Sequence, residues 1–408
     1  MVIIFLTINI ISCIRGFYNG LLPLNNLFFN ITNLIFFYFV GRFALVLGKK
    51  NEVISSLFLG ILFYGLIDLF LLYFSPFAFV LGSQSAVLFD NESISSTNSI
   101  ASSFGFQSER IIFPLASLGW GATHLGSIMG VIFVASCINL IYIRLDNKER
   151  FFKYRFRDFS WLTVHLVSIV ISFWMIVLAD SRAALFACFI SVLTFLSLRI
   201  LFIKPSFVKL LLKHVPNFFI SFYLFSFLYM YFKDVLAYIL ETTNLYRSGS
   251  SSSVFSSRDI IWEIVLKFFT DFSPDHIIGY GVWGHYATGI NRLYEAVVFK
   301  SFTSNRFTLH STILQQLIDT GYLGIFVYTF LTLLLLKSST TIFLKTITSN
   351  FDDPQSYPTV FSSWTNLGVL FYLIMVGASD TVITMERQFS MNIYLVLVMS
   401  SLILVQKR

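Results

Sequence analysis

The chain has 408 residues, of which 56% are hydrophobic and 12% are charged. Its mean hydropathy of +0.77 excludes both a soluble globular protein and a disordered chain. The formal net charge of +7 does not indicate nucleic-acid binding, because the cations cluster in short loops between apolar runs, where membrane topology places them. The three cysteines, Cys13, Cys137 and Cys188, are scattered through apolar runs and give neither a disulfide framework nor a metal-ligand spacing.

Ten apolar runs recur along the chain, and most are long enough to cross the roughly 30 Å hydrocarbon core of a bilayer as a helix. Because lipid offers the backbone no hydrogen-bond partners, we expect helices rather than strands. The sequence therefore predicts an all-α, polytopic membrane bundle of about ten transmembrane helices. The runs cover residues 1–14, 25–47, 53–74, 118–143, 161–180, 183–203, 216–235, 312–336, 361–379 and 389–406.

The first run resembles the core of a signal peptide, but no basic stretch precedes it and no cleavage site is evident. We interpret it as a first transmembrane helix, of a chain that could be truncated at this end.

Loops rich in Lys and Arg alternate with cation-poor loops, which is the pattern expected when the basic loops face the cytoplasm. A single threading puts all of them, with the tail Lys407–Arg408, on the cytoplasmic side. The basic run 144–157 could also form a patch for anionic lipid or a partner, although a topogenic role suffices to explain it. The basic loops lie at residues 48–52, 144–160, 199–215 and 337–360.

The same threading leaves residues 83–117 and the long segment 236–309 outside. Loops as long as the second are usually functional or disordered. We therefore divide the chain into an N-terminal part of the bundle (1–235), an external loop (236–309) and a C-terminal part of the bundle (310–408).

Part of the external loop has a helical pattern. Ser256 and Asp259 have the spacing of a capping box, which predicts a helix start near Arg258. An apolar face follows, so this helix is expected to lie on the membrane or to roof the bundle. Ser248–Ser253 before it is expected to be a flexible linker, and Gly279–Gly284 after it a turn-rich stretch. The apolar face comprises Ile261, Ile264, Val265, Phe268 and Phe269.

Three arginines stand out among those on the outer side, where the positive-inside rule gives no reason for them: Arg110, Arg182 and Arg258. Arg247, Arg292 and Arg306 lie in the long loop without motif context and are interpreted as solvated charges. Arg182 occupies a short outer turn and could pair with Asp180 or snorkel, and Arg258 could be a solvated helix charge. The functional alternative is an anion clamp, because guanidinium stays charged and grips phosphate oxygens bidentately.

His310 begins the helix that re-enters the membrane, and Gln315, Gln316 and Asp319 follow on that helix. The ordinary pKa of histidine, about 6.5, suits a general base that takes a proton from a hydroxyl. An interfacial histidine bonded to backbone is the alternative. Nothing in the sequence singles out His124, His276 or His285, and Asp68 is an acid within the third apolar run that could pair with an arginine on a neighbouring helix.

These features form an ordered pattern: Ser181-Arg182-Ala183 before an apolar helix, Arg258 with Trp262, the stretch GYGVWG, and His310-Ser311 with Leu314-Gln315, Leu317, Gly321 and Gly324. Over roughly residues 100–385 the pattern resembles the O-antigen ligase and O-antigen polymerase (Wzy-type) superfamily of bacterial membrane glycosyltransferases. It departs from the family at Ser311, where asparagine often follows the histidine.

The resemblance implies a GT-C-like fold and a multi-pass protein of the bacterial inner membrane with its site facing the periplasm. It implies transfer of a glycan from undecaprenyl pyrophosphate to an acceptor sugar, without metal or cofactor. The expected partners are this donor, the acceptor, the bilayer and a regulator of chain length, and no nucleic acid. Catalytic roles would fall to His310, Arg182 and Arg258, and substrate contacts to Arg110, Gly279, Gly281 and Gln315.

The acceptor separates two activities within the family. A polymerase extends another lipid-linked repeat unit, whereas a ligase transfers the glycan to the lipid A core. We favour a polymerase, because the chain is divergent and rich in Phe. A transporter or flippase of envelope glycans is the alternative from another class, and it would predict internal repeats, which are not visible in this sequence.

Overall fold

The computed structural model describes residues 1–47, 50–74, 100, 122–146, 155–201, 214, 217, 258–298, 308–348, 357–385 and 388–402. Within these ranges the regular structure is helical and contains no strand. The prediction of an all-α bundle is confirmed.

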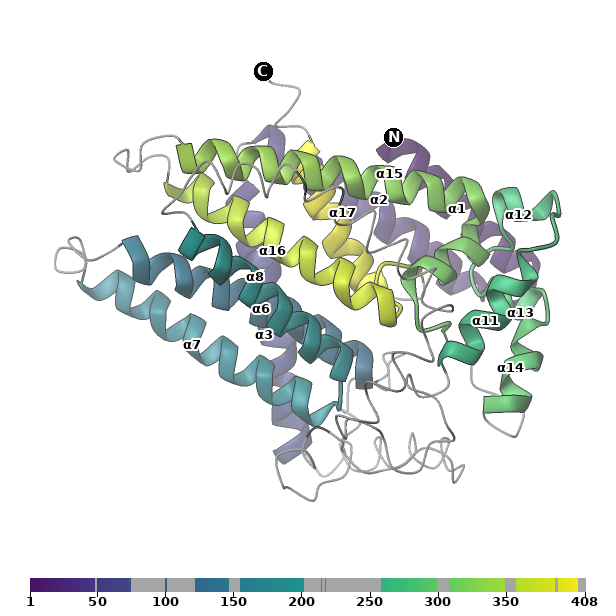
Figure 1. Cartoon of the computed structure of the whole chain (residues 1–408), viewed down its shortest axis with the longest axis horizontal. Coiled ribbons are helices and arrows are strands. Elements are labelled where there is room, and N and C mark those ends of the chain that lie inside the picture. The colour runs from purple at the N-terminus through teal and green to yellow at the C-terminus, as the bar shows by residue number, and fades with distance from the viewer. Residues whose placement is uncertain are drawn as a thin grey trace. The chain divides into compact units, whose positions relative to one another are not determined.

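The predicted apolar runs coincide with helices, except the run at 216–235, which lies almost entirely outside the described residues. Among the residues that the structure describes, four stretches are long and apolar enough to cross a membrane, in α2, α3, α6 and α15, and shorter apolar helices accompany them. The protein is therefore a multi-pass membrane protein. The helices, labelled in Figure 1, are α1 (Val2–Tyr18), α2 (Leu24–Val46), α3 (Lys50–Phe74), α6 (Ala122–Asp146), α7 (Arg155–Leu178), α8 (Arg182–Leu201), α15 (Thr312–Thr348), α16 (Tyr357–Ser379) and α17 (Gln388–Leu402).

The chain divides into two compact units, each built from segments distant in the sequence. Unit 1 contains Met1–Val40, Val215–Leu335 and Gly377–Leu395, and unit 2 contains Gly41–His214, Leu336–Val376 and Val396–Arg408. His310 and Arg258 belong to unit 1, and Arg182 belongs to unit 2.

In unit 2, α6 packs against α3, α7 and α8, and α7 also contacts α3 and α8 (Figure 1). Close packing depends on Gly130 of α6, where a Cβ atom would collide with the Tyr372 ring, and the Tyr372 hydroxyl donates to the Ser127 carbonyl at 2.7 Å. Thr365 similarly donates to Asn139 at 2.6 Å. Such bonds satisfy polar groups that lipid could not.

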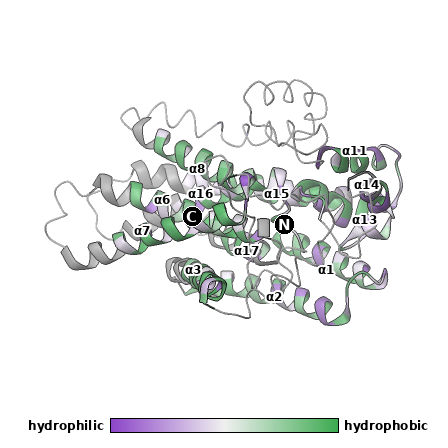
Figure 2. Ribbon diagram, turned by 90° about the horizontal axis from the view of Figure 1, so that it is seen from below, coloured by the Kyte–Doolittle hydropathy of each residue, from purple (hydrophilic) through white to green (hydrophobic). Residues whose placement is uncertain are grey.

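In unit 1, four short helices precede α15: α11 (Arg258–Phe268), α12 (Asp275–Ile278), α13 (Gly284–Ala287) and α14 (Ile290–Val298). Figure 2 shows that α11, α13 and α14 mix hydrophilic and hydrophobic residues, as expected for helices outside the hydrocarbon core. Ser256 and Ser248–Ser253 lie outside the described residues.

The apolar face of α11 packs on the first turns of α15. Ile261, Val265 and Phe269 are buried, in one cluster with Leu314 and Ile318 of α15. Ile264 and Phe268 are partly buried against the same cluster. The expected helix start at Arg258 is confirmed, and the apolar face of this helix is buried against α15.

A bend at Gly321 separates the first turns of α15 from its longer part. Gly321 has φ +68°, outside the helical region. The turn at Gly279–Gly281 lies against this bend, because the amide of Tyr280 donates to the Ile318 carbonyl at 2.9 Å and that of Gly281 to the Asp319 carbonyl at 3.0 Å. Arg15 of α1 donates to the Gly279 carbonyl and pairs with Asp275 at 3.0 Å. The predicted turn-rich stretch is confirmed.

Candidate functional site

His310 lies two residues before α15 in the left-handed backbone region, with φ +52°. This conformation is unfavourable for a residue with a Cβ atom, so it requires support from neighbouring groups. The preceding residue, Leu309, supplies that support, because both polar groups of its backbone are bonded to side chains. The Trp262 indole donates to the Leu309 carbonyl at 3.0 Å, and the Leu309 amide donates to Oε1 of Gln315 at 3.0 Å.

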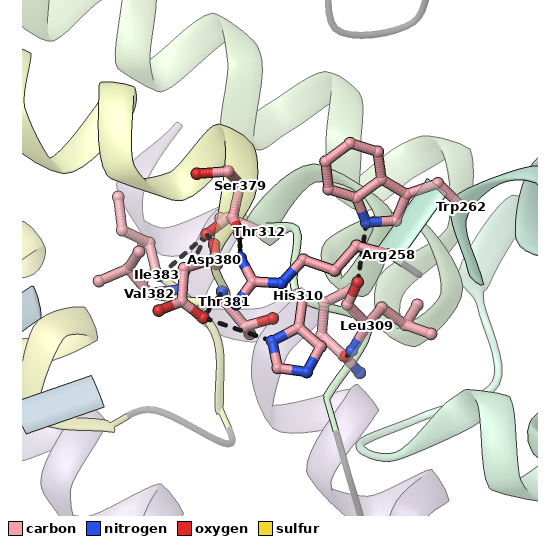
Figure 3. A network of polar contacts seen from close by, with 11 residues as sticks. Arg258, Trp262, Leu309, His310, Thr312, Ser379, Asp380, Thr381, Val382 and Ile383 are labelled. Atoms are coloured by element: carbon pink, nitrogen blue, oxygen red, sulfur yellow. Dashed lines mark hydrogen bonds and ion pairs between the residues drawn. The ribbon is translucent and has the colours of Figure 1, made fainter. Parts of the chain in front are cut away.

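Asp380 follows the last residue of α16 and faces His310 (Figure 3). Its Oδ1 lies 3.8 Å from Nδ1 of His310 and also accepts the amide of Thr381 at 2.8 Å. The Asp380 side chain is 4% exposed and that of His310 is 24% exposed. A fixed carboxylate therefore faces a partly accessible imidazole, and such a carboxylate orients the ring and stabilises its protonated form.

Thr312 connects the two segments that carry this pair. Its hydroxyl donates to the Asp380 carbonyl at 3.1 Å and accepts the amide of Val382 at 2.9 Å. Gln316, one turn further along α15, donates to the Ile383 carbonyl at 2.8 Å. The segment after α16 is thus bonded to the start of α15.

Arg258, the first residue of α11, extends toward the end of α16 and donates to the Ser379 carbonyl (Figure 3). A cation at a helix C-terminus interacts favourably with the helix dipole and with the last carbonyls. The contact brings the guanidinium beside the residue that precedes Asp380. A positive charge and the His310–Asp380 pair consequently meet in one place.

A buried polar cluster lies behind Leu309. Gln315 donates through Nε2 to both carboxylate oxygens of Asp319, at 3.1 and 3.0 Å, and lies 3.4 Å from Nδ1 of His285. The amide of Gly284 donates to Oδ1 of Asp319 at 3.0 Å. On α14, burial raises the pKa of the Tyr294 hydroxyl, which therefore stays neutral.

The structure brings together three of the predicted site residues, His310, Arg258 and Gln315, within unit 1. Gln315 makes its contacts inside the protein and is 0% exposed. Gly279 and Gly281 shape the turn against α15. Their roles toward substrate stay predictions.

Arg182 is the first residue of α8 and is exposed, after a turn in which Asp180 has φ +49°. This is the short turn expected between two helices, and its place on the outer side stays a prediction. The Asp180 carboxylate accepts the amide of Ile100 at 3.1 Å. Arg110 lies outside the described residues.

Two residues of the site carried no recognised signal in the sequence: Asp380 and His285. Asp380 could have been noticed from its position in the sequence, because it is an acidic residue directly after the apolar run 361–379. His285 stands in a turn-rich loop and is 0% exposed. Within the described ranges, no group of three or more His, Cys, Asp or Glu side chains could hold a metal ion.

The arrangement has three chemical capacities. The imidazole can accept a proton, the buried carboxylate can stabilise the resulting charge, and the guanidinium can bind an anion. This combination suits the activation of a hydroxyl beside an anionic substrate.

Comparison with known proteins gives a family-model match over part of the chain. Residues 167–329 match the family model described as Wzy_C: O-Antigen ligase, and this range contains Arg182, Arg258 and His310 but ends before Asp380. No curated protein and no solved structure matches the chain. The match supports the resemblance stated from the sequence motifs: residues 167–329 are similar to the superfamily of O-antigen ligases and polymerases, which are membrane glycosyltransferase-like enzymes.

Proposed function

We propose that the protein is an O-antigen or surface-polysaccharide polymerase that transfers a glycan from undecaprenyl pyrophosphate to the end of another lipid-linked repeat unit. The observation that carries the proposal is the pairing of His310 with Asp380, at 3.8 Å, beside Arg258. An imidazole oriented by a carboxylate can activate a hydroxyl, and a nearby guanidinium can stabilise a pyrophosphate leaving group.

In the proposed step, His310 takes the proton of the acceptor hydroxyl while the acceptor oxygen attacks the anomeric carbon of the donor glycan. The new C–O bond forms as the bond between that carbon and the pyrophosphate oxygen breaks. The electron pair leaves with undecaprenyl pyrophosphate. The proton resides on the imidazole, whose Nδ1 faces Asp380, so Nε2 on the opposite side of the ring is the nitrogen that would receive it.

The arginines would bind the pyrophosphate. Arg258 is a candidate because it lies next to the His310–Asp380 pair. Arg182 is a second candidate because it is exposed at the first turn of a helix, where backbone amides also favour an anion. Arg110 is a third, from its place in the sequence alone.

The site is proposed to face the periplasm. Under the positive-inside rule, the basic loops and the C-terminal Lys407–Arg408 lie in the cytoplasm, which puts the end of α15 that carries His310 on the opposite side. A lipid-linked donor of the inner membrane is accessible from that side.

A ligase that transfers the glycan to the lipid A core is the second candidate. It is favoured by one observation, the description of the matching family model as O-antigen ligase. The site serves both activities equally well, because both transfer a glycan from the same kind of donor to a hydroxyl.

The test is a chromosomal deletion in the native host, complemented with wild type, His310→Ala or Arg182→Ala and analysed by gel electrophoresis of the envelope glycan. The proposal expects the long-chain ladder to return with wild type and to be absent with either variant. Normal ladders from both variants at equal protein level would refute glycan transfer. In the deletion strain, core carrying a single repeat unit indicates a polymerase, and core carrying none indicates a ligase.

A further inference from the structure

The backbone of His310 is held in place through the residue before it. Leu309 is 0% exposed, and both polar groups of its backbone bond to side chains: the carbonyl to Trp262 and the amide to Gln315. The left-handed φ of His310 follows directly after this fixed peptide. The direction of the imidazole therefore depends on these two bonds.

Gln315 is in turn fixed by Asp319, which lies one helical turn further along α15. The Gln315 amide group donates to both carboxylate oxygens, so its Oε1 is directed at the Leu309 amide. Asp319 also accepts the Gly284 amide, and it is 3% exposed. The orientation of the amide is thereby determined, since a flipped Gln315 would present oxygen to a carboxylate and nitrogen to an N–H donor.

We propose that Gln315 and Asp319 are positioning residues of the transfer reaction, which fix the backbone amide of Leu309, the residue before His310, and so aim the imidazole at the acceptor hydroxyl. Neither residue touches the substrate in this proposal. The inference rests on the proposed role of His310 as the base. It revises the expectation that Gln315 binds substrate, because a fully buried side chain with both polar groups bonded internally is poorly placed for that role.

The inference can be tested by exchanging the amide group of Gln315 with the carboxylate of Asp319. Gln315→Glu keeps an oxygen for the Leu309 amide but sets two carboxylates against each other. Gln315→Glu combined with Asp319→Asn restores one amide and one carboxylate. The amide introduced by Asp319→Asn can then donate through its nitrogen to the carboxylate introduced by Gln315→Glu, and its oxygen can still accept the Gly284 amide. The bonds to the Leu309 and Gly284 amides and a bond between the two side chains therefore have equivalents in the double variant, whereas the contact of the Gln315 amide with Nδ1 of His285 does not.

The rate is measured with purified protein in liposomes, using as donor the lipid-linked glycan extracted from the deletion strain. Gln315→Glu is expected to lower kcat about 10- to 100-fold with little change in KM for the donor, because a misdirected base affects the chemical step and not binding. Adding Asp319→Asn to Gln315→Glu is expected to recover most of the lost kcat. A double variant no faster than Gln315→Glu alone would overturn the inference.

A second comparison separates positioning from a general loss of folded protein. In a His310→Ala background, Gln315→Glu is expected to cause no further loss of the residual rate, because the residue acts through His310. The positioning role would be contradicted if Gln315→Glu lowered the transfer rate by the same factor in the wild-type and His310→Ala backgrounds. It would also be contradicted if donor binding weakened while kcat stayed unchanged. If His310→Ala itself retains the wild-type rate, the proposed function fails, whereas an inactive His310→Ala with a fully active Gln315→Glu rejects only the positioning role.

Discussion

Nδ1 of His310 lies 3.8 Å from Oδ1 of Asp380, and one hydroxyl, that of Thr312, bonds the backbone on the Asp380 side. Thr312, two residues after His310, therefore bonds the backbone of Asp380 to the start of α15. The pairing of the two side chains can be tested by substituting either one, because the backbone of Asp380 is held by a separate bond to Thr312.

Asp380→Asn removes the charge and keeps the shape. The protonated imidazole then loses its stabilising carboxylate, and we expect kcat to fall about 100- to 10,000-fold, the range set by comparable His–Asp pairs. The measurement is the transfer rate in liposomes with the extracted lipid-linked donor. Asp275→Asn is the matched control, since its carboxylate pairs with Arg15 on the surface, and it should leave the rate within about twofold. A rate for Asp380→Asn equal to that of this control would refute the pairing.

Thr312→Val replaces the bridging hydroxyl with a methyl group of equal size. The amide of Val382 and the carbonyl of Asp380 would lose their buried partner, and we expect a loss of stability of about 1–3 kcal/mol. Thermal unfolding of the detergent-solubilised protein measures it. Thr341→Val is the control, because its hydroxyl bonds to the Lys337 carbonyl on an exposed part of α15. Equal melting temperatures for the two variants would show that the bridge contributes nothing.

Trp262→Phe keeps an aromatic ring in the cluster under α11 but removes the donor to the Leu309 carbonyl. Because that bond supports the backbone next to His310, the transfer rate is expected to fall about tenfold while the protein remains folded. Trp174→Phe offers a comparison, since its indole bonds to the Tyr73 hydroxyl at an exposed position. The idea fails if both tryptophan variants transfer glycan at the same rate.

Gly279→Ala tests the turn that lies against the bend of α15. Gly279 has φ +76°, and a Cβ atom there would collide with the backbone of Gly321 and Asp319. Gly289→Ala provides the control, because Gly289 has a similar φ of +75° but no atom within 4 Å of the added Cβ. Both substitutions carry the cost of a left-handed alanine, about 1–2 kcal/mol, so only Gly279→Ala should lose folded protein beyond that amount. Fluorescence-detected size exclusion gives the folded fraction, and equal fractions would exclude the collision.

The spans and the helix at Arg258 could be predicted from the sequence because they depend on local information. Hydrophobicity determines the spans, and the apolar spacing after Arg258 determines which face of α11 is buried. His310 stands out in the sequence because an ionisable group at the edge of an apolar run is costly without a role, and its role in catalysis stays a prediction.

Asp380 and the role of Gln315 could not be predicted in the same way. Asp380 becomes part of the site through its contact with His310, which is far away in the sequence. The periodicity of apolar residues along a helix does not predict such a contact. Gln315 has the residue type of a substrate ligand, and only its burial and its bonds to Leu309 and Asp319 indicate an internal role. The role of Arg182 in binding the substrate stays a prediction, and so do the roles of the other predicted substrate-binding residues.

The position of Asp380 after α16 also has a consequence for biosynthesis. A growing chain that has inserted α15 already carries Arg258 and His310, but it lacks the carbonyl of Ser379, the carboxylate of Asp380 and the segment that Thr312 and Gln316 bind. The site is completed only when α16 has been translated and threaded through the membrane. A nascent chain that ends before α16 is therefore expected to lack a complete site.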